Sequence, residues 1–188
     1  QLARFFPLLQ QGFEVLVTAH QTVRELLCQD LELAPAYVET RIQTIFLDGK
    51  PVDDLDRSRV PPGATLALSA AMPGLVGAIL RRGSYYAAMR REITHQETER
   101  LSPATSGLIK LKLFNLLAAE LGPTLLARGI WLSRDQWRQF LQGCPAGFWS
   151  EMLDLHWEDI PVSPTVLLER SQTLPTARIR LVVRLSEP

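Results

Sequence analysis

Glycines and arginines lie close together between residues 70 and 91, and together they could bind an anion. Glycines let backbone N–H groups approach a phosphate or carboxylate, and guanidinium groups bind either anion through paired hydrogen bonds. The residues concerned are Gly74, Gly77, Arg81, Arg82, Arg90 and Arg91. Their spacing matches neither GxGxxG nor GxxxxGK[ST]. Two interpretations stay open: an anion site in an arginine-lined cleft between domains, or a packed connector.

We favour the connector, because the same stretch contains apolar side chains at helical spacing. The connector interpretation predicts that four of these apolar side chains are buried: Leu75, Val76, Ile79 and Leu80. The arginines would then mark the point where the chain returns to solvent.

A second group of cations comes from the alternation of two predicted strands, LIKLKLF and ARIRLVVRL. Successive side chains of a strand point to opposite faces, so the cations oppose the aliphatic residues. If the strands are neighbours, five cations cover one face: Lys110, Lys112, Arg178, Arg180 and Arg184. We expect that face either to be solvated, where its charges also prevent aggregation, or to contact an acidic protein partner. Nucleic acid is the weaker interpretation, because the net charge is zero and we expect no aromatic side chain there for bases to stack on.

Local motifs for catalysis or metal binding are missing from the sequence. The three histidines are far apart, and no HExxH, GxSxG or SxxK pattern occurs. We therefore predict no catalytic residue, no metal and no cofactor. Cys28 and Cys144 could form one disulfide, but we favour two reduced cysteines packed in or near the core.

The composition indicates an ordinary folded protein. The 188 residues are 46% hydrophobic, and 20 basic residues balance 20 acidic ones, so no overall charge directs the chain to nucleic acid or to an anionic membrane. The longest uncharged stretch, 60–80, is too broken by proline and glycine to supply the roughly 20 apolar residues of a membrane span. With no secretory signal visible, we expect a cytoplasmic protein.

Turn and capping residues predict the elements of the first half. We expect a hairpin of strands 3–9 and 13–19, followed by a helix capped by Thr22 and Glu25. Asp48 and Gly49 predict the turn of a second hairpin, 44–52. A strand over 64–70 completes this half.

The second half is predicted as strands interleaved with short helices. It opens with the strand 108–114 and a helix over 115–121 that Gly122 and Pro123 break. A helix capped by Ser133 and Gln136 follows and reaches Gln142. Residues 166–170 are predicted to be extended, and 177–185 form the last strand. The whole chain is thus predicted to be α+β.

The element order of residues 1–77, with DGKPV and VPPGATLALSAAMPG, resembles the β-grasp (ubiquitin-like) fold and its sulfur-carrier proteins of thiamine and molybdopterin biosynthesis. Those carriers act through a terminal Gly-Gly carboxylate, whereas here the tail reads PGLVG and 111 residues follow. We therefore expect the fold without carrier chemistry. The predicted organisation is a β-grasp-like domain over 1–80, a connector over 81–107 and a smaller α+β domain over 108–188. The predicted role is non-catalytic protein binding; the alternative is an enzyme or anion-binding protein that uses the interdomain cleft.

Overall fold

The protein is a mixed α+β structure built on one seven-stranded sheet, which confirms the predicted class. The computed structural model describes residues 2–18, 21–72, 74–90, 94–95, 106–151, 154–173 and 177–184. A separate pair of two-residue strands, β7 (His156–Trp157) and β8 (Ile160–Pro161), lies outside this sheet.

The sheet is formed by β1 (Phe13–Val17), β2 (Thr44–Leu47), β3 (Lys50–Pro51), β4 (Thr65–Ser69), β5 (Gly107–Phe114), β6 (Ile130–Ser133) and β9 (Arg178–Leu181). The α-helices are α1 (Phe6–Gln11), α2 (Val23–Glu25), α3 (Pro35–Thr40), α4 (Gly74–Leu80), α5 (Leu116–Arg128), α6 (Arg134–Gly143) and α7 (Pro164–Gln172). The remaining helical segments are η1 (Leu2–Phe5), η2 (Leu26–Asp30), η3 (Tyr85–Arg90) and η4 (Ala146–Glu151).

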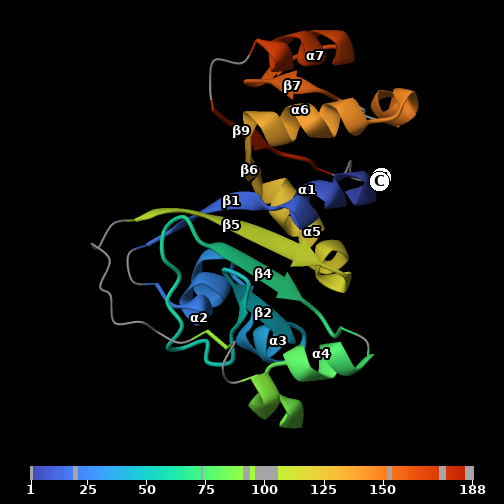
Figure 1. The fold of residues 1–188 in the computed structure, drawn as a ribbon. Coiled ribbons are helices and arrows are strands. Elements are labelled where there is room, and N and C mark those ends of the chain that lie inside the picture. Colours follow the sequence, from blue (N-terminus) through green and yellow to red (C-terminus); the bar gives the residue numbers. More distant parts are fainter. Residues whose placement is uncertain are drawn as a thin grey trace.

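Strands from the two halves of the chain are intermixed in the sheet, whose order is β3-β2-β4-β5-β1-β6-β9. Figure 1 shows β5 running between β1 and β4. β5 is parallel to β4 and antiparallel to β1. The predicted connector over 81–107 therefore joins two adjacent strands of one sheet.

One hydrophobic core lies against the inner face of this sheet and draws on both halves. Leu66 and Leu68 of β4 point to the same face as their register partners on β5, Leu111 and Leu113, and all four are buried. The helical segments α2, η2, α3 and α5 add further buried aliphatic side chains to the same cluster. Tyr37 of α3 and Arg41, the C-cap residue of that helix, both donate hydrogen bonds to the carboxylate of Glu120 on α5, which ties these helices together.

Local signals predicted several elements correctly. Thr22 and Ser133 each cap a helix with the full reciprocal capping box, accepting from the N–H of Glu25 and Gln136. The Asp48-Gly49 turn joins β2 to β3, with φ of 48° and 77° at the two positions. Strands β4 and β9 lie within the predicted ranges 64–70 and 177–185, and β9 is shorter than predicted. Strand β5 begins one residue before the predicted range 108–114.

The predicted first strand is wrong, because residues 2–11 are helical and only β1 of that hairpin is present. Pro7 lies in the first turn of α1, where its missing N–H costs nothing. Phe5, Leu8 and Leu9 then fall at helical spacing and are all buried.

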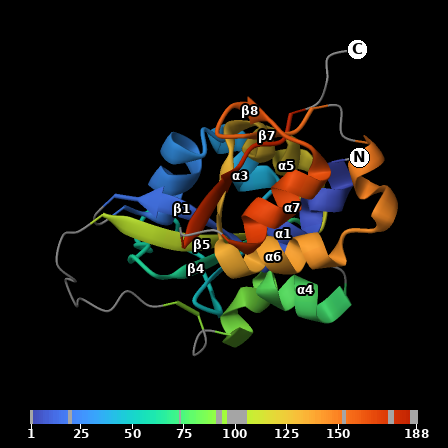
Figure 2. The same cartoon turned by 90° about the horizontal axis from the view of Figure 1, so that it is seen from above.

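Two further predictions fail where helices replace other structure. Helix α5 continues through Gly122 and Pro123 instead of ending there. A Cβ at Gly122 would lie 2.9 Å from Leu9 Cδ1, so this glycine lets α5 pack closely on α1. Residues 166–170 belong to helix α7, whose N-terminus is capped by the Ser163 hydroxyl and has Pro164 in its first turn. Helices α6 and α7 lie side by side (Figures 1 and 2), joined by a hydrogen bond from Trp137 Nε1 to Ser171 Oγ of 2.9 Å.

Candidate functional site

A row of side chains crosses the sheet on the face opposite the core. Lys110 of β5 pairs in register with Glu14 of β1, and Glu14 pairs with Trp131 of β6. Trp131 pairs in turn with Arg180 of β9. Residues in register point to the same face of a sheet. We call this surface the outer face; its residues used below are Glu14, Leu16, Leu108, Lys110, Lys112, Trp131, Arg178 and Arg180.

The structure thus brings four of the five predicted cations onto one face. The strands that carry them are not neighbours, because β1 and β6 lie between β5 and β9. Arg184 lies beyond the end of β9 and does not join the row.

The outer face has a positive charge. Its four cations face one carboxylate, Glu14, so its net charge is +4 − 1 = +3. Glu14 forms an ion pair with Arg178. Arg180 donates a hydrogen bond of 2.7 Å to the carbonyl of Arg128, and it lies over Gly129, where a Cβ would be 2.8 Å from Arg180 Nε. These contacts direct the Arg178 guanidinium toward β1 and the Arg180 guanidinium toward the end of α5.

Exposed apolar side chains interrupt these charges. Trp131 is 42% exposed and Leu16 is 61% exposed, and Leu16 pairs with the half-buried Leu108. The expectation that no aromatic side chain shares this face is therefore wrong. Phe46 also lies on it, through its pairing with Ala67.

Sequence reasoning missed Trp131 because it considered only the two strands with alternating cations. The signal was present in GIWLS, where Trp131 stands between Ile130 and Leu132. Those two aliphatic residues are buried, so strand alternation places the indole on the other face.

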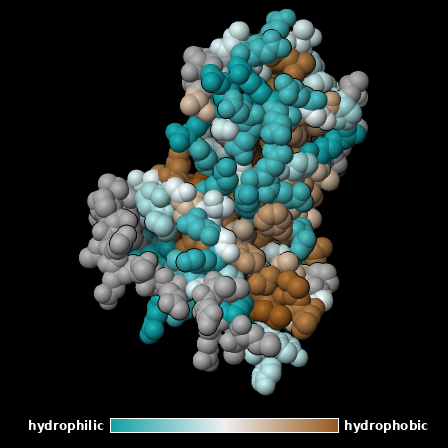
Figure 3. Space-filling view, viewed as in Figure 1, coloured by the Kyte–Doolittle hydropathy of each residue, from teal (hydrophilic) through white to brown (hydrophobic). Residues whose placement is uncertain are grey.

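The glycine and arginine segment forms a surface helix rather than a buried connector. Leu75 is 67% exposed and Val76 is 64% exposed, so their predicted burial is wrong; Ile79 and Leu80 are half-buried. Helix α4 turns its first residues outward because Gly77 packs against the Met72 carbonyl, 2.0 Å from a Cβ placed there. Figure 3 shows the resulting apolar patch over α4.

Two of the predicted anion ligands are occupied by contacts within the protein. Arg82 donates to the carbonyls of Val38 and Ile42 and pairs with Glu39. Arg90 is buried and bridges α4 to the loop after β3 through a two-pronged contact with Asp53.

The other residues of the predicted anion site do not point toward a common position. The Arg81 side chain is exposed, Gly74 begins α4, and Arg91 lies outside the described residues. No convergent anion site is therefore formed by the members of this group that the structure describes.

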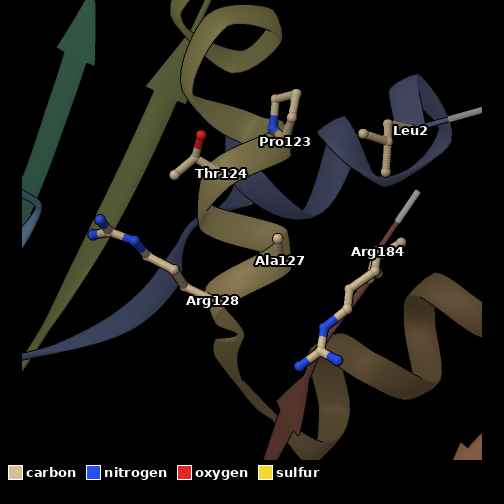
Figure 4. A pocket seen from close by; sticks show the side chains of 7 residues that line it. Leu2, Pro123, Thr124, Ala127, Arg128 and Arg184 are labelled. Carbon is tan, nitrogen blue, oxygen red and sulfur yellow. The ribbon is translucent and has the colours of Figure 1, made fainter. Parts of the chain in front are cut away.

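A pocket of about 510 Å³ lies instead between the C-terminal half of α5 and the segment after β9. It is lined by Leu2, Pro123, Thr124, Ala127, Arg128, Val183 and Arg184. Arg128 extends away from Leu2 (Figure 4) and is paired with Glu32 on another element. The remaining walls of the pocket are mainly apolar. None of the arginines between residues 81 and 91 that were predicted to bind an anion lines the pocket.

Across the described ranges, His, Cys, Asp and Glu form no group of three or more that could hold a metal ion, and none of the helices is long and apolar enough to cross a membrane. Cys28 and Cys144 are both free, and burial raises the pKa of Cys144.

Comparisons with protein-family models, curated proteins and solved structures found no match to this chain.

Proposed function

We propose that this protein is a non-catalytic binding module that docks an acidic protein partner on its outer face. The observation that carries the proposal is Trp131, an exposed indole in the middle of a cationic row. Large apolar side chains usually lie in the interior of a folded protein. A half-exposed tryptophan on a rigid sheet therefore indicates a surface that contacts another molecule.

The neighbours of Trp131 fit a protein interface. Tryptophan and arginine are the residues that most often dominate the binding energy of such interfaces. Trp131 and Leu16 supply apolar area, and the net charge of +3 around them favours a partner with carboxylates. Arg178 and Arg180 are already held in place, so little side-chain entropy would be lost on binding.

The proposal includes a β-grasp core without carrier chemistry. The parallel pair β4–β5 has an antiparallel strand on each side, and helical segments pack on one face, which supports a β-grasp arrangement. In this arrangement β5, which follows β4 in the chain, is the strand that pairs in parallel with β4. We also infer a reducing, cytoplasmic location, supported by the two free cysteines.

Replacing Trp131 tests the proposal. The full chain, immobilised, is exposed to a lysate of its own source cells as wild type, Trp131→Ser and Leu75→Ser. Leu75→Ser is the control, because it removes an apolar side chain that is even more exposed than Trp131 from another surface. We expect a partner that is retained by the wild type and by Leu75→Ser and lost with Trp131→Ser.

Two results would contradict this function. One is equal retention of partners by Trp131→Ser, provided that its thermal melt matches that of the wild type. The other is binding of a labelled single-stranded oligonucleotide that weakens steeply with salt and is lost in Arg178→Ser/Arg180→Ser. The second result would replace a protein partner with nucleic acid.

A further inference from the structure

Strand β9, red in Figure 2, is one edge of the seven-stranded sheet. Its single partner in the described structure is β6, with Ile179 opposite Leu132 and Arg180 opposite Trp131. An edge strand presents unpaired N–H and C=O groups that can pair with another chain. This edge therefore offers a second mode of recognition beside the outer face.

Strand β9 makes no backbone hydrogen bond to an element other than β6 among the residues that the structure describes. Its backbone hydrogen bonds join it to β6, and the flanking bonds from Arg134 N–H to the Ala177 carbonyl and from Val183 N–H to the Leu126 carbonyl lie outside the strand. The free side of β9 thus keeps its donors and acceptors for a further strand.

The opposite edge of the sheet is less suited to such pairing. Strand β3 has only two residues, Lys50 and Pro51. Pro51 has no N–H to donate, and its carbonyl already accepts a hydrogen bond of 2.8 Å from the N–H of His95. Of the two edges, β9 is the one that can accept a strand.

The side chains of β9 specify what that strand should carry. Arg178 and Arg180 lie on the outer face, and Ile179 and Leu181 lie on the inner face, half-buried against the core. A neighbouring strand places its residues directly opposite these. Carboxylates at alternate positions would lie opposite the two arginines, whose guanidinium groups would turn from Glu14 and the Arg128 carbonyl toward the new strand. Apolar residues between the carboxylates would cover Ile179 and Leu181.

A second copy of this chain does not fit the edge. Antiparallel pairing of two β9 strands keeps both outer faces on the same side of the sheet. The central pairings would then set Arg178 and Arg180 of one copy against the same arginines of the other. Like charges directly opposite each other destabilise a sheet.

We propose that an extended acidic segment of the partner adds to β9 as a new edge strand, with carboxylates opposite Arg178 and Arg180. This inference rests on the proposed function, because it names the part of the protein partner that binds. Backbone hydrogen bonds supply affinity in this mode, and alternate side chains supply specificity.

The test uses capped, fluorescent peptides of about eight residues, an ordinary strand length. The first alternates Glu with Val, and the second alternates Lys with Val. Two more peptides have the Glu-Val sequence with every second backbone amide N-methylated. One carries the methyl groups on the odd-numbered residues and the other on the even-numbered residues. Fluorescence anisotropy measures their binding to the full chain, to Arg178→Ser/Arg180→Ser and to Trp131→Ser.

We expect the Glu-Val peptide to bind and the Lys-Val peptide not to bind. Only one set of alternate amides faces β9, so one N-methylated peptide should lose at least about tenfold in affinity and the other should keep it. Arg178→Ser/Arg180→Ser should lose about tenfold. Trp131→Ser should change the affinity little, because Trp131 is on β6 and away from the free edge.

Three outcomes would overturn this inference. They are absence of binding by the Glu-Val peptide, equal binding of both N-methylated peptides, and a loss with Trp131→Ser as large as that with the two arginine substitutions. The last outcome would place the peptide on the outer face and leave the proposed function standing. Failure of the proposed function is recognised separately, by retention of the cellular partner in Trp131→Ser.

Discussion

Arg90 is a buried structural cation, and its removal should weaken the fold strongly. Its side chain is 1% exposed. Its Nη2 and Nη1 groups donate to the two Asp53 oxygens at 2.7 and 3.0 Å, and its Nε–H donates to the Ile79 carbonyl at 2.7 Å. A further donation, of 2.9 Å, reaches the Thr94 hydroxyl. These contacts tie α4 and η3 to the loop after β3.

We expect Arg90→Met to lower the free energy of unfolding by about 3 kcal/mol. Breaking a buried ion pair by removing one partner costs roughly 3–5 kcal/mol. The Asp53 side chain is 35% exposed, so water can partly solvate the carboxylate that remains, which favours the lower end of that range. Methionine keeps much of the side-chain volume and limits the cavity that forms.

Two further variants separate the ion pair from other causes. Arg81→Met is the matched control on the same segment, because its side chain is exposed; its effect should stay within about 0.5 kcal/mol. Arg90→Met with Asp53→Leu should cost less than the sum of the two single substitutions, because no charge is then left without its partner.

Urea denaturation followed by tryptophan fluorescence measures these differences, with an unchanged dependence on urea as the check for two-state unfolding. A loss below about 1 kcal/mol for Arg90→Met, or strict additivity in the double substitution, would refute this reasoning. If Arg90 were an anion ligand instead, inorganic phosphate would stabilise the wild type and not Arg90→Met. We expect phosphate to shift both midpoints equally.

Three smaller effects follow from other contacts, each measured by denaturation. Thr22→Ala should cost about 1 kcal/mol, because the Thr22 hydroxyl accepts from the N–H of Glu25 at 3.2 Å. Gly122→Ala should cost about 1–3 kcal/mol, since its Cβ would meet the buried Leu9, whereas Gly143→Ala has open space and should be neutral or stabilising. The pKa of Glu120 is lowered, first by the hydrogen bond from Arg41, so its contribution to stability should be present above its ordinary pKa of 4.5 and be lost as the pH falls through the lower folded value.

A specific result would contradict each of these three predictions. Thr22→Ser keeps the capping hydroxyl and should recover most of the loss; failure to do so would separate the effect from capping. Equal stabilities of Gly122→Ala and Gly143→Ala would argue against close packing of α5 on α1. For Glu120→Gln, a deficit relative to the wild type that persisted in acid would exclude the ionised carboxylate as its cause.

Short-range chemistry made much of the fold predictable. A capping box, a positive-φ turn and two-residue alternation each act within a few residues, so Thr22, Asp48-Gly49 and LIKLKLF could be interpreted from the sequence alone. The first segment was not predictable in this way, because the unbroken apolar run 5–9 suits either a helix or a buried strand.

Long-range packing decided the remaining features. The chain tolerates Pro123 within α5 because buried side chains before and after it, Leu121 and Leu125, hold the helix against the core. The outer face depends on register between strands far apart in the chain, so alternation predicted which way Lys110 and Arg180 point but not that Glu14 and Trp131 stand between them. Exposure of Leu75 depends in the same way on what packs around α4.

The insertion of β5 between β4 and β1 constrains how the protein is made. As the ribosome synthesises the chain, β1 emerges early, yet both its partner strands, β5 and β6, come after residue 106. Closing the pair Val17–Gly107 requires a long intervening segment to be ordered, which slows folding. Until then β1 lacks a partner and one side of β4 stays open, so the nascent chain passes through a stage that is prone to aggregation and suited to chaperone binding. A fragment ending at residue 80 would remain at that stage.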